Sequence, residues 1–154
     1  MSTREFILIQ LGVIHDQQGW FVPLNHAVKD ITPEQAAWTS SDQSNSIWGI
    51  VEHLIFYNER YLDRFQKISV HREPVDSIAD TFNISNQRSW PEAAAYLNEL
   101  MLKWRDAVKE AKPEDFTEAM TDLTHLTLHN AYHIGQIVSI RKQQGSWRTD
   151  LGVT

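Results

Sequence analysis

Helix-start signals recur along the chain, and they constrain its fold more than any other feature of the sequence. Ser2, Thr32 and Ser89 are each followed three residues later by Glu or Gln, which is the pattern of a capping box. In the second of these signals Pro33 takes the first helical position, where a proline is well tolerated. No segment of useful length alternates apolar and polar residues as a strand would. The chain is therefore expected to be all-helical.

The spacing of apolar residues between these signals predicts long amphipathic helices. Ser46 or Asn45 can cap the second of them, and Gly145 is placed to stop the last in a left-handed conformation. A short turn of helix should follow Thr32, and Pro113 should end the region before the last helix. The predicted long helices cover about residues 3–14, 47–67, 89–109 and 121–144.

The topology is indicated by the segment 69–88, which we expect to connect the second and third long helices. Such a connection is long for adjacent antiparallel helices. It suggests a crossover along the bundle in place of a simple up-down-up-down chain. No repeat, low-complexity tract or Gly/Ser linker divides the sequence. We therefore predict one domain over residues 1–154, an all-α four-helix bundle with a long crossover connection.

Composition excludes several classes of protein. The net charge is −6 without a run of Lys or Arg, so nucleic acid is not an expected partner. No stretch approaches the roughly 18 apolar residues of a membrane span, and the N-terminal residues do not resemble a signal peptide. We therefore expect a cytoplasmic protein. The absence of cysteine rules out disulfides, a thiolate metal ligand and a Cys nucleophile.

Three of the 7 histidines, His125, His129 and His133, follow one another at steps of four on the predicted last helix. Residues four apart share a helix face, so two such imidazoles can bind one metal ion. At about 100° per residue, His129 and His133 border the apolar stripe, whereas His125 falls on the solvent side. From this pattern alone, metal ligation and an ordinary hydrogen-bonded role are equally good interpretations of His129 and His133.

A third ligand would have to come from another helix, and His53 is the candidate. The helical wheel places it about 60° beyond the edge of its own apolar stripe, so periodicity leaves its role open. We interpret His15, His26 and His71 as surface or hydrogen-bonded residues, the ordinary roles of a lone histidine.

Two motifs together resemble those of the DinB/YfiT-like metalloenzymes. The segment 125–137, HLTLHNAYHIGQI, with a basic pair at 141–142, resembles the family's last-helix motif, approximately His-x-x-x-His-x-Gly-Gln-Ile. The segment 46–53, SIWGIVEH, resembles the second-helix motif that ends in the first metal-binding histidine, and residues 32–36 resemble the part after the first helix. The resemblance implies a four-helix bundle with an unusual crossover. It also implies a metal site on His53, His129 and His133, often holding zinc or nickel.

Some relatives in that family are transferases or isomerases that depend on small thiols, and members often form homodimers. The resemblance thus favours a divalent-metal-dependent enzyme that transfers a low-molecular-weight thiol onto an electrophilic substrate, and it makes a homodimer plausible. A metal-dependent hydrolase, a non-enzymatic metal-binding or stress-related protein, and a plain helical interaction module are the alternatives. Gln136 either hydrogen-bonds a ligand histidine or a bound water, or lies at the surface. Glu52 lies about 100° around the helix from His53, and Arg141 is expected at a solvated helix end.

Overall fold

Four long helices make up most of the molecule. The computed structural model describes residues 1–84 and 87–154, and those residues contain helices but no strand. The prediction of an all-helical chain is confirmed. The long helices are α1 (Thr3–His15), α4 (Ile47–Gln66), α5 (Trp90–Glu110) and α6 (Pro113–Gln144). The short ones are α2 (Leu24–Ala27), α3 (Pro33–Ala37) and the 3₁₀ helices η1 (Ile78–Phe82) and η2 (Thr149–Leu151).

The helices begin where the sequence signals predict. Ser2, Thr32 and Ser89 each form a complete capping box, and the Ser46 side chain accepts a hydrogen bond from the backbone N–H of Gly49. A cap of this kind stabilises a helix by about 1 kcal/mol, because it satisfies a backbone donor that has no partner within the helix. Local capping chemistry therefore sets most of the helix starts.

The start of α6 differs from the prediction. Pro113 does not merely end the preceding region: it is the first residue of α6, so the expected start near residue 121 was wrong. Its missing N–H costs nothing there, because the first helical N–H groups have no partner within the helix. Asp115 completes the start by accepting a hydrogen bond from the backbone N–H of Lys112, at 2.8 Å. A turn of only two residues therefore joins α5 to α6.

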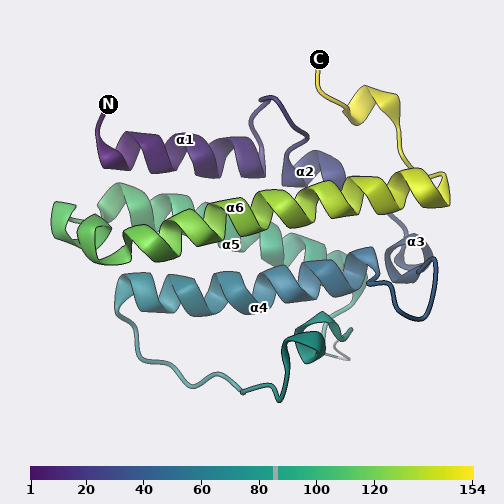
Figure 1. Ribbon diagram of the computed structural model, residues 1–154, viewed down its shortest axis with the longest axis horizontal. Helices are drawn as coiled ribbons and strands as arrows, with labels where there is room; N and C mark the ends of the chain where they lie inside the picture. Colours follow the sequence, from purple (N-terminus) through teal and green to yellow (C-terminus); the bar gives the residue numbers. More distant parts are fainter. Residues whose placement is uncertain (85–86) are drawn as a thin grey trace.

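The order of the long helices around the bundle is α1, α5, α4, α6, so that α4 packs against both α5 and α6 (Figure 1). Glu52 near the start of α4 pairs with Arg88 just before α5, which shows that these two neighbours run parallel. Lys67 at the end of α4 pairs with Asp115 at the start of α6, so those two run antiparallel. Parallel neighbours joined in sequence require a crossover, as predicted.

The crossover runs along the outside of α4 and carries η1 back against that helix (Figure 1). The predicted connection includes Ser85 and Asn86, which lie outside the described residues. Gly49 lets η1 approach closely, because a Cβ atom there would lie only 2.6 Å from the backbone oxygen of Phe82. The connection is therefore a packed part of the fold, in contact with the face of α4 that bears His53.

The apolar stripes of all four long helices meet in one core. Burying them supplies most of the stability of such a bundle, at about 25 cal/mol per Å² of apolar surface. The largest fully buried core residues are Ile7, Leu11, Ile47, Ile50, Leu54, Ile55, Leu97, Met101, Trp104, Leu123 and Ile134.

Among the described residues, no helix has both the length and the apolar character needed to cross a membrane.

Candidate metal centre

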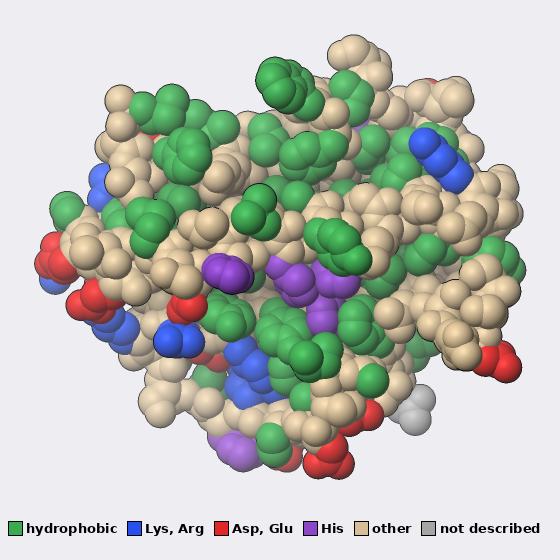
Figure 2. Space-filling view, in the orientation of Figure 1, with side chains coloured by type: hydrophobic (Ala, Val, Ile, Leu, Met, Phe, Trp, Pro, Cys, Tyr) green, Lys and Arg blue, Asp and Glu red, His purple; other side chains and the backbone are tan. Residues whose placement is uncertain are grey.

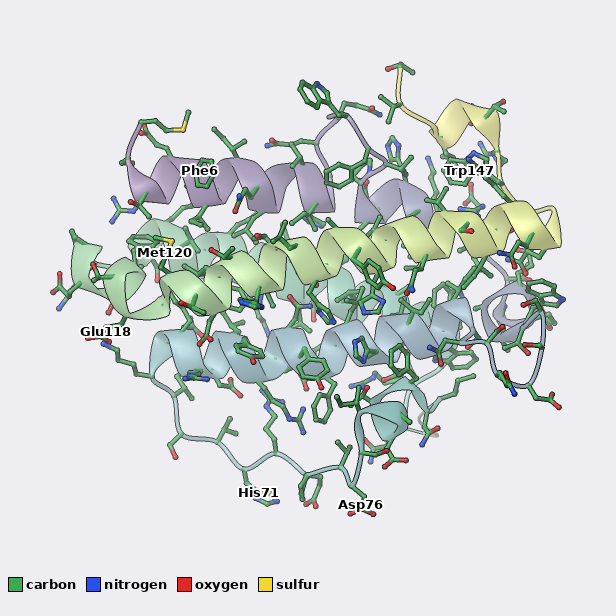
Figure 3. All side chains as sticks on the ribbon, in the orientation of Figure 1. Phe6, His71, Asp76, Glu118, Met120 and Trp147 are labelled. Carbon is green, nitrogen blue, oxygen red and sulfur yellow. The ribbon has the colours of Figure 1, made fainter. Side chains whose placement is uncertain are left out.

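The three histidines expected from the sequence lie together between α4 and α6. Nε2 of His129 is 3.0 Å from Nε2 of His53 and 3.1 Å from Nε2 of His133. One ligand nitrogen from each of the three histidines lies within 4.8 Å of the other two. Nitrogen-bearing rings gather between the two helices in Figure 3, and histidines reach the surface of that seam in Figure 2. The site is therefore accessible from one face of the molecule.

Two neighbouring side chains fix the tautomers of the buried rings. The Thr81 hydroxyl donates to the backbone oxygen of Ile78 at 2.6 Å, so it accepts a hydrogen bond from Nδ1–H of His53, also at 2.6 Å. Nδ1–H of His133 donates to Oε1 of Gln136 at 2.7 Å. Because Nδ1 carries the hydrogen in both neutral rings, Nε2 of His53 and Nε2 of His133 present lone pairs. Both lone pairs belong to the nitrogens that converge on His129.

The electrostatics of the cluster keep the rings neutral. Burial, and then the neighbouring imidazoles, lower the pKa of His53 to about 3. Burial and the proximity of His133 lower the pKa of His129 to about 4. Burial likewise lowers the pKa of His133, against a smaller raising effect of the Gln136 hydrogen bond. Neutral imidazoles are the form in which histidine binds a metal.

This donor set fits a divalent cation. Three nitrogens that each lie about 2.0–2.1 Å from a tetrahedral zinc ion would be about 3.3 Å apart, close to the observed 3.0 and 3.1 Å. Of the converging Nε2 atoms only that of His129 can carry a hydrogen, and this single hydrogen can serve only one of its two contacts. The other contact therefore lacks a donor of its own unless a cation lies among the three nitrogens. Imidazole ligands suit zinc, nickel, copper and iron.

The crossover completes the site in a way that helical periodicity does not reveal. Phe82 of η1 stacks on the His53 ring, with centroids 3.9 Å apart and planes 8° apart, and Tyr57 contacts the same ring edge-on. His53 is consequently only 3% exposed, although it lies outside the apolar stripe of α4. Thr81 and Phe82 are thus two site residues that the sequence reasoning missed. Nothing in the connection's composition singles them out.

The other residues considered from the sequence have separate places. Gln136 hydrogen-bonds the candidate ligand His133, as described, which is one of the roles predicted for it. The carboxylate of Glu52 is buried and pairs with Arg88 at 2.8 Å, so it does not enter the histidine cluster. Arg141 is 1% exposed and donates to the backbone oxygens of Ala27 and Ser146. Its expected place at a solvated helix end was wrong, because the chain before α3 and after α6 folds over it.

The remaining histidines lie away from the cluster. His125 is exposed, as the helical wheel predicts, and His71 lies on the outer side of the crossover beside Glu73 (Figure 3). His15 is buried and bonds Oδ1 of Asn98 at 2.6 Å, whereas His26 bonds the backbone oxygen of Leu151 at 3.2 Å. Each of these has the surface or hydrogen-bonded role expected of a lone histidine.

A four-helix bundle with a crossover and a three-histidine cluster between two antiparallel helices defines a class of helical proteins whose histidines could hold a metal ion. The chain belongs to the DinB superfamily, which matches residues 23–138 and so includes all three histidines. This confirms the family resemblance seen in the sequence. No curated protein and no solved structure matches the chain.

Proposed function

We propose that the protein is a divalent-metal-dependent enzyme in which His53, His129 and His133 hold zinc or nickel and a small thiol is transferred onto an electrophilic substrate. The convergence of the three Nε2 atoms carries the proposal, because neutral imidazoles with opposed lone pairs are stabilised by a shared cation. A divalent ion on three such ligands lowers the pKa of a bound thiol or water.

The chain's own residues orient and shield this centre. Thr81 and Gln136 hold the His53 and His133 rings with Nε2 inward, as hydrogen bonds to metal ligands commonly do. Phe82 and Tyr57 pack around His53 and exclude water from its side of the cluster. His129 is only partly buried, so a substrate would approach from its side.

The proposed reaction needs no protein base at the reacting carbon. The sulfur supplies the electron pair for a new C–S bond, the leaving group departs with the electrons of its own bond to carbon, and the thiol proton passes to solvent. Metal-assisted hydrolysis usually adds a carboxylate or histidine as general base. The nearest acid in sequence, Glu52, is held by Arg88 instead. This pairing favours thiol transfer over the hydrolase alternative.

The first test is the metal content of protein purified without a histidine tag. We expect about one equivalent of zinc or nickel in the wild type and a loss of most of it in His53→Ala and His129→Ala, because two imidazoles hold a metal weakly. His125→Ala is the matched control for metal content, since it removes an exposed histidine one helical turn from His129. Equal metal content in all four proteins would end the proposal that these histidines hold the metal, and the absence of metal from all four would leave a plain helical module.

The second test separates an enzyme from a metal-binding protein. Metal-loaded protein is incubated with amino-acid, tripeptide and sugar thiols and a fluorogenic alkyl bromide, and conjugation is followed over the uncatalysed rate. We expect at least one thiol to be turned over, and the rate to disappear after chelation or in His129→Ala. A metal-loaded protein that accelerates conjugation of none of these thiols would be a binding protein instead.

A further inference from the structure

A groove runs from the histidine cluster along the seam of α4 and α6. Its cavity of about 180 Å³ is lined by Tyr57, Tyr61, Asp122, His125, Leu126 and His129. The same helix faces that carry the cluster continue into it, since Tyr57 and Tyr61 follow His53 at steps of four, and Leu126 and Asp122 precede His129 at steps of three and four. Its inner end is therefore His129, the most accessible of the three candidate metal ligands.

The walls of the groove are apolar and its far end is polar. The rings of Tyr57 and Tyr61 lie 6.4 Å apart at 32°, and the Tyr57 ring also meets the His129 ring edge-on at 5.5 Å. Leu126 closes the α6 side. At the far end the Asp122 carboxylate supplies a negative charge. It pairs with Arg64 at 3.3 Å, but that arginine side chain is 72% exposed, and an exposed ion pair contributes little.

The volume limits what the groove can hold. An apolar cavity of about 150 Å³ accommodates benzene, and pockets for drug-sized ligands span about 300–1,000 Å³. A cavity of about 180 Å³ thus matches one aromatic ring with small substituents. Tyrosine side chains favour such a ring, since offset and edge-on aromatic contacts add to the burial of its surface.

We propose that this groove binds a single-ring aromatic substrate, with a metal-binding donor atom at the His129 end and a cationic or hydrogen-bond-donating group at the Asp122 end. The proposal rests on the metal centre proposed above and names the class of substrate that reaches it. The Tyr57 and Tyr61 rings recognise the aromatic group, Asp122 recognises the distal group, and the donor atom is placed beside the cluster.

Hydroxamates test this proposal, because the hydroxamate group binds the metal and the substituent reports on the groove. Affinities of zinc-loaded protein for acetohydroxamate and benzohydroxamate are measured by calorimetry. We expect benzohydroxamate to bind the wild type about tenfold more tightly, and this ratio to fall to near one in Tyr61→Ala. Tyr132→Ala is the matched control: this tyrosine is 64% exposed and lies beside His133, 5.1 Å between ring centroids, but does not line the groove.

A third probe examines the polar end without touching the core. We expect 4-(aminomethyl)benzohydroxamate to bind the wild type about threefold more tightly than benzohydroxamate, and Asp122→Asn to remove that gain. Asp122 is near the surface, so this arm stands even if Tyr61→Ala fails to fold. Equal affinities of wild-type protein for acetohydroxamate and benzohydroxamate would overturn the groove proposal and leave the metal centre intact. If neither compound binds and no zinc is retained, the metal centre itself has failed.

Discussion

Two buried polar clusters lie in the same seam between α4 and α6, and their hydrogen bonding differs. Asn58 and Asn130 exchange two hydrogen bonds, at 2.9 and 3.1 Å, so that each amide donates to the other and accepts from it. The nearby histidines instead bring together nitrogens of which at most one can donate. The asparagine pair satisfies its hydrogen bonds within the protein, whereas the histidine cluster has more acceptors than donors at its centre.

This difference separates a structural polar pair from the candidate metal site. A buried polar group costs free energy unless it finds a partner, and the asparagine pair meets that condition by itself. The histidine cluster satisfies its buried nitrogens when a cation lies among the three of them. Two of its rings are moreover held with their lone pairs inward by Thr81 and Gln136. The comparison predicts that mutations in the two clusters will have separable effects.

The largest expected effect is the response of stability to metal. At a free zinc concentration about 1,000 times Kd, the wild-type protein should gain about 4 kcal/mol, or roughly 8–16 °C in Tm for a chain of 154 residues. His129→Ala should lose nearly all of this gain, because it removes the central ligand. Thermal unfolding followed by circular dichroism with and without zinc measures it. Asn130→Ala should unfold at a lower temperature but keep the full zinc response; a lost response there would show that the two clusters are not separable.

The second effect concerns the asparagine pair alone. Asn130→Ala leaves the buried Oδ1 of Asn58 without its donor, while the Asn58 amide nitrogen keeps its bond to the backbone oxygen of Leu54. With the cavity that the truncation creates, we expect the metal-free protein to lose about 2–4 kcal/mol in urea unfolding. Replacing both with leucine removes the unsatisfied groups as well, and should cost less than the sum of the single substitutions. Strictly additive losses would mean that the two side chains do not act as a pair.

The third effect is smaller and lies beside the metal centre. Thr81→Val removes the acceptor for Nδ1–H of His53, so we expect zinc affinity to fall by about 10–100-fold. The metal-free protein should lose about 1–3 kcal/mol, because the buried Nδ1–H is left without a partner. Competition with a chromogenic chelator measures the affinity. Thr124→Val is the control, because that exposed threonine bonds only the backbone of its own helix at Met120. A Thr81→Val protein with wild-type affinity would show that the hydroxyl does not orient the ring.

Helical periodicity and capping predict much of this structure. Capping residues mark where each helix begins, and periodicity shows which of its faces packs against the other helices. They place the helix starts at Ser2, Ser46 and Ser89, the inward positions of His129 and His133, and the outward position of His125. Once the helices are placed, the length of the connection between the second and third long helices predicts the crossover. The helix starts and the directions of the histidines follow from interactions within a helix or between apolar stripes, which the local sequence encodes directly.

Two of the misses, His53 and Arg141, have a common physical cause. His53 lies outside its apolar stripe, yet it is buried because Phe82 of the crossover covers it. Arg141 is buried because the chain outside the long helices folds over the end of α6. Non-helical segments carry no periodic signal, so the surfaces they cover are read from sequence as exposed. The place of His53 in the histidine cluster could be inferred from the family resemblance, but not from the helical wheel.

The last and smallest effect tests whether the crossover holds His53 in place, and the chain offers a pair of glycines for it. A Cβ on Gly49 would lie 2.6 Å from the backbone oxygen of Phe82, so Gly49→Ala must push η1 outward and carry Thr81 and Phe82 away from His53. Because the displaced group is backbone, we expect a loss of stability of about 1–3 kcal/mol. Zinc affinity should fall by about tenfold, near the low end expected for losing the Thr81 contact.

Gly135 lies two residues after His133 on α6, and nothing lies within 4 Å of the position its Cβ would occupy. Gly135→Ala should therefore leave zinc affinity unchanged and raise stability by about 0.5–1 kcal/mol, since alanine favours a helix over glycine. The two substitutions add the same methyl group next to the same metal centre, so a difference between them isolates the contact with η1. If both bind zinc as the wild type does, η1 covers His53 without positioning it, and the orientation of that ring must come from α4 and α6 alone.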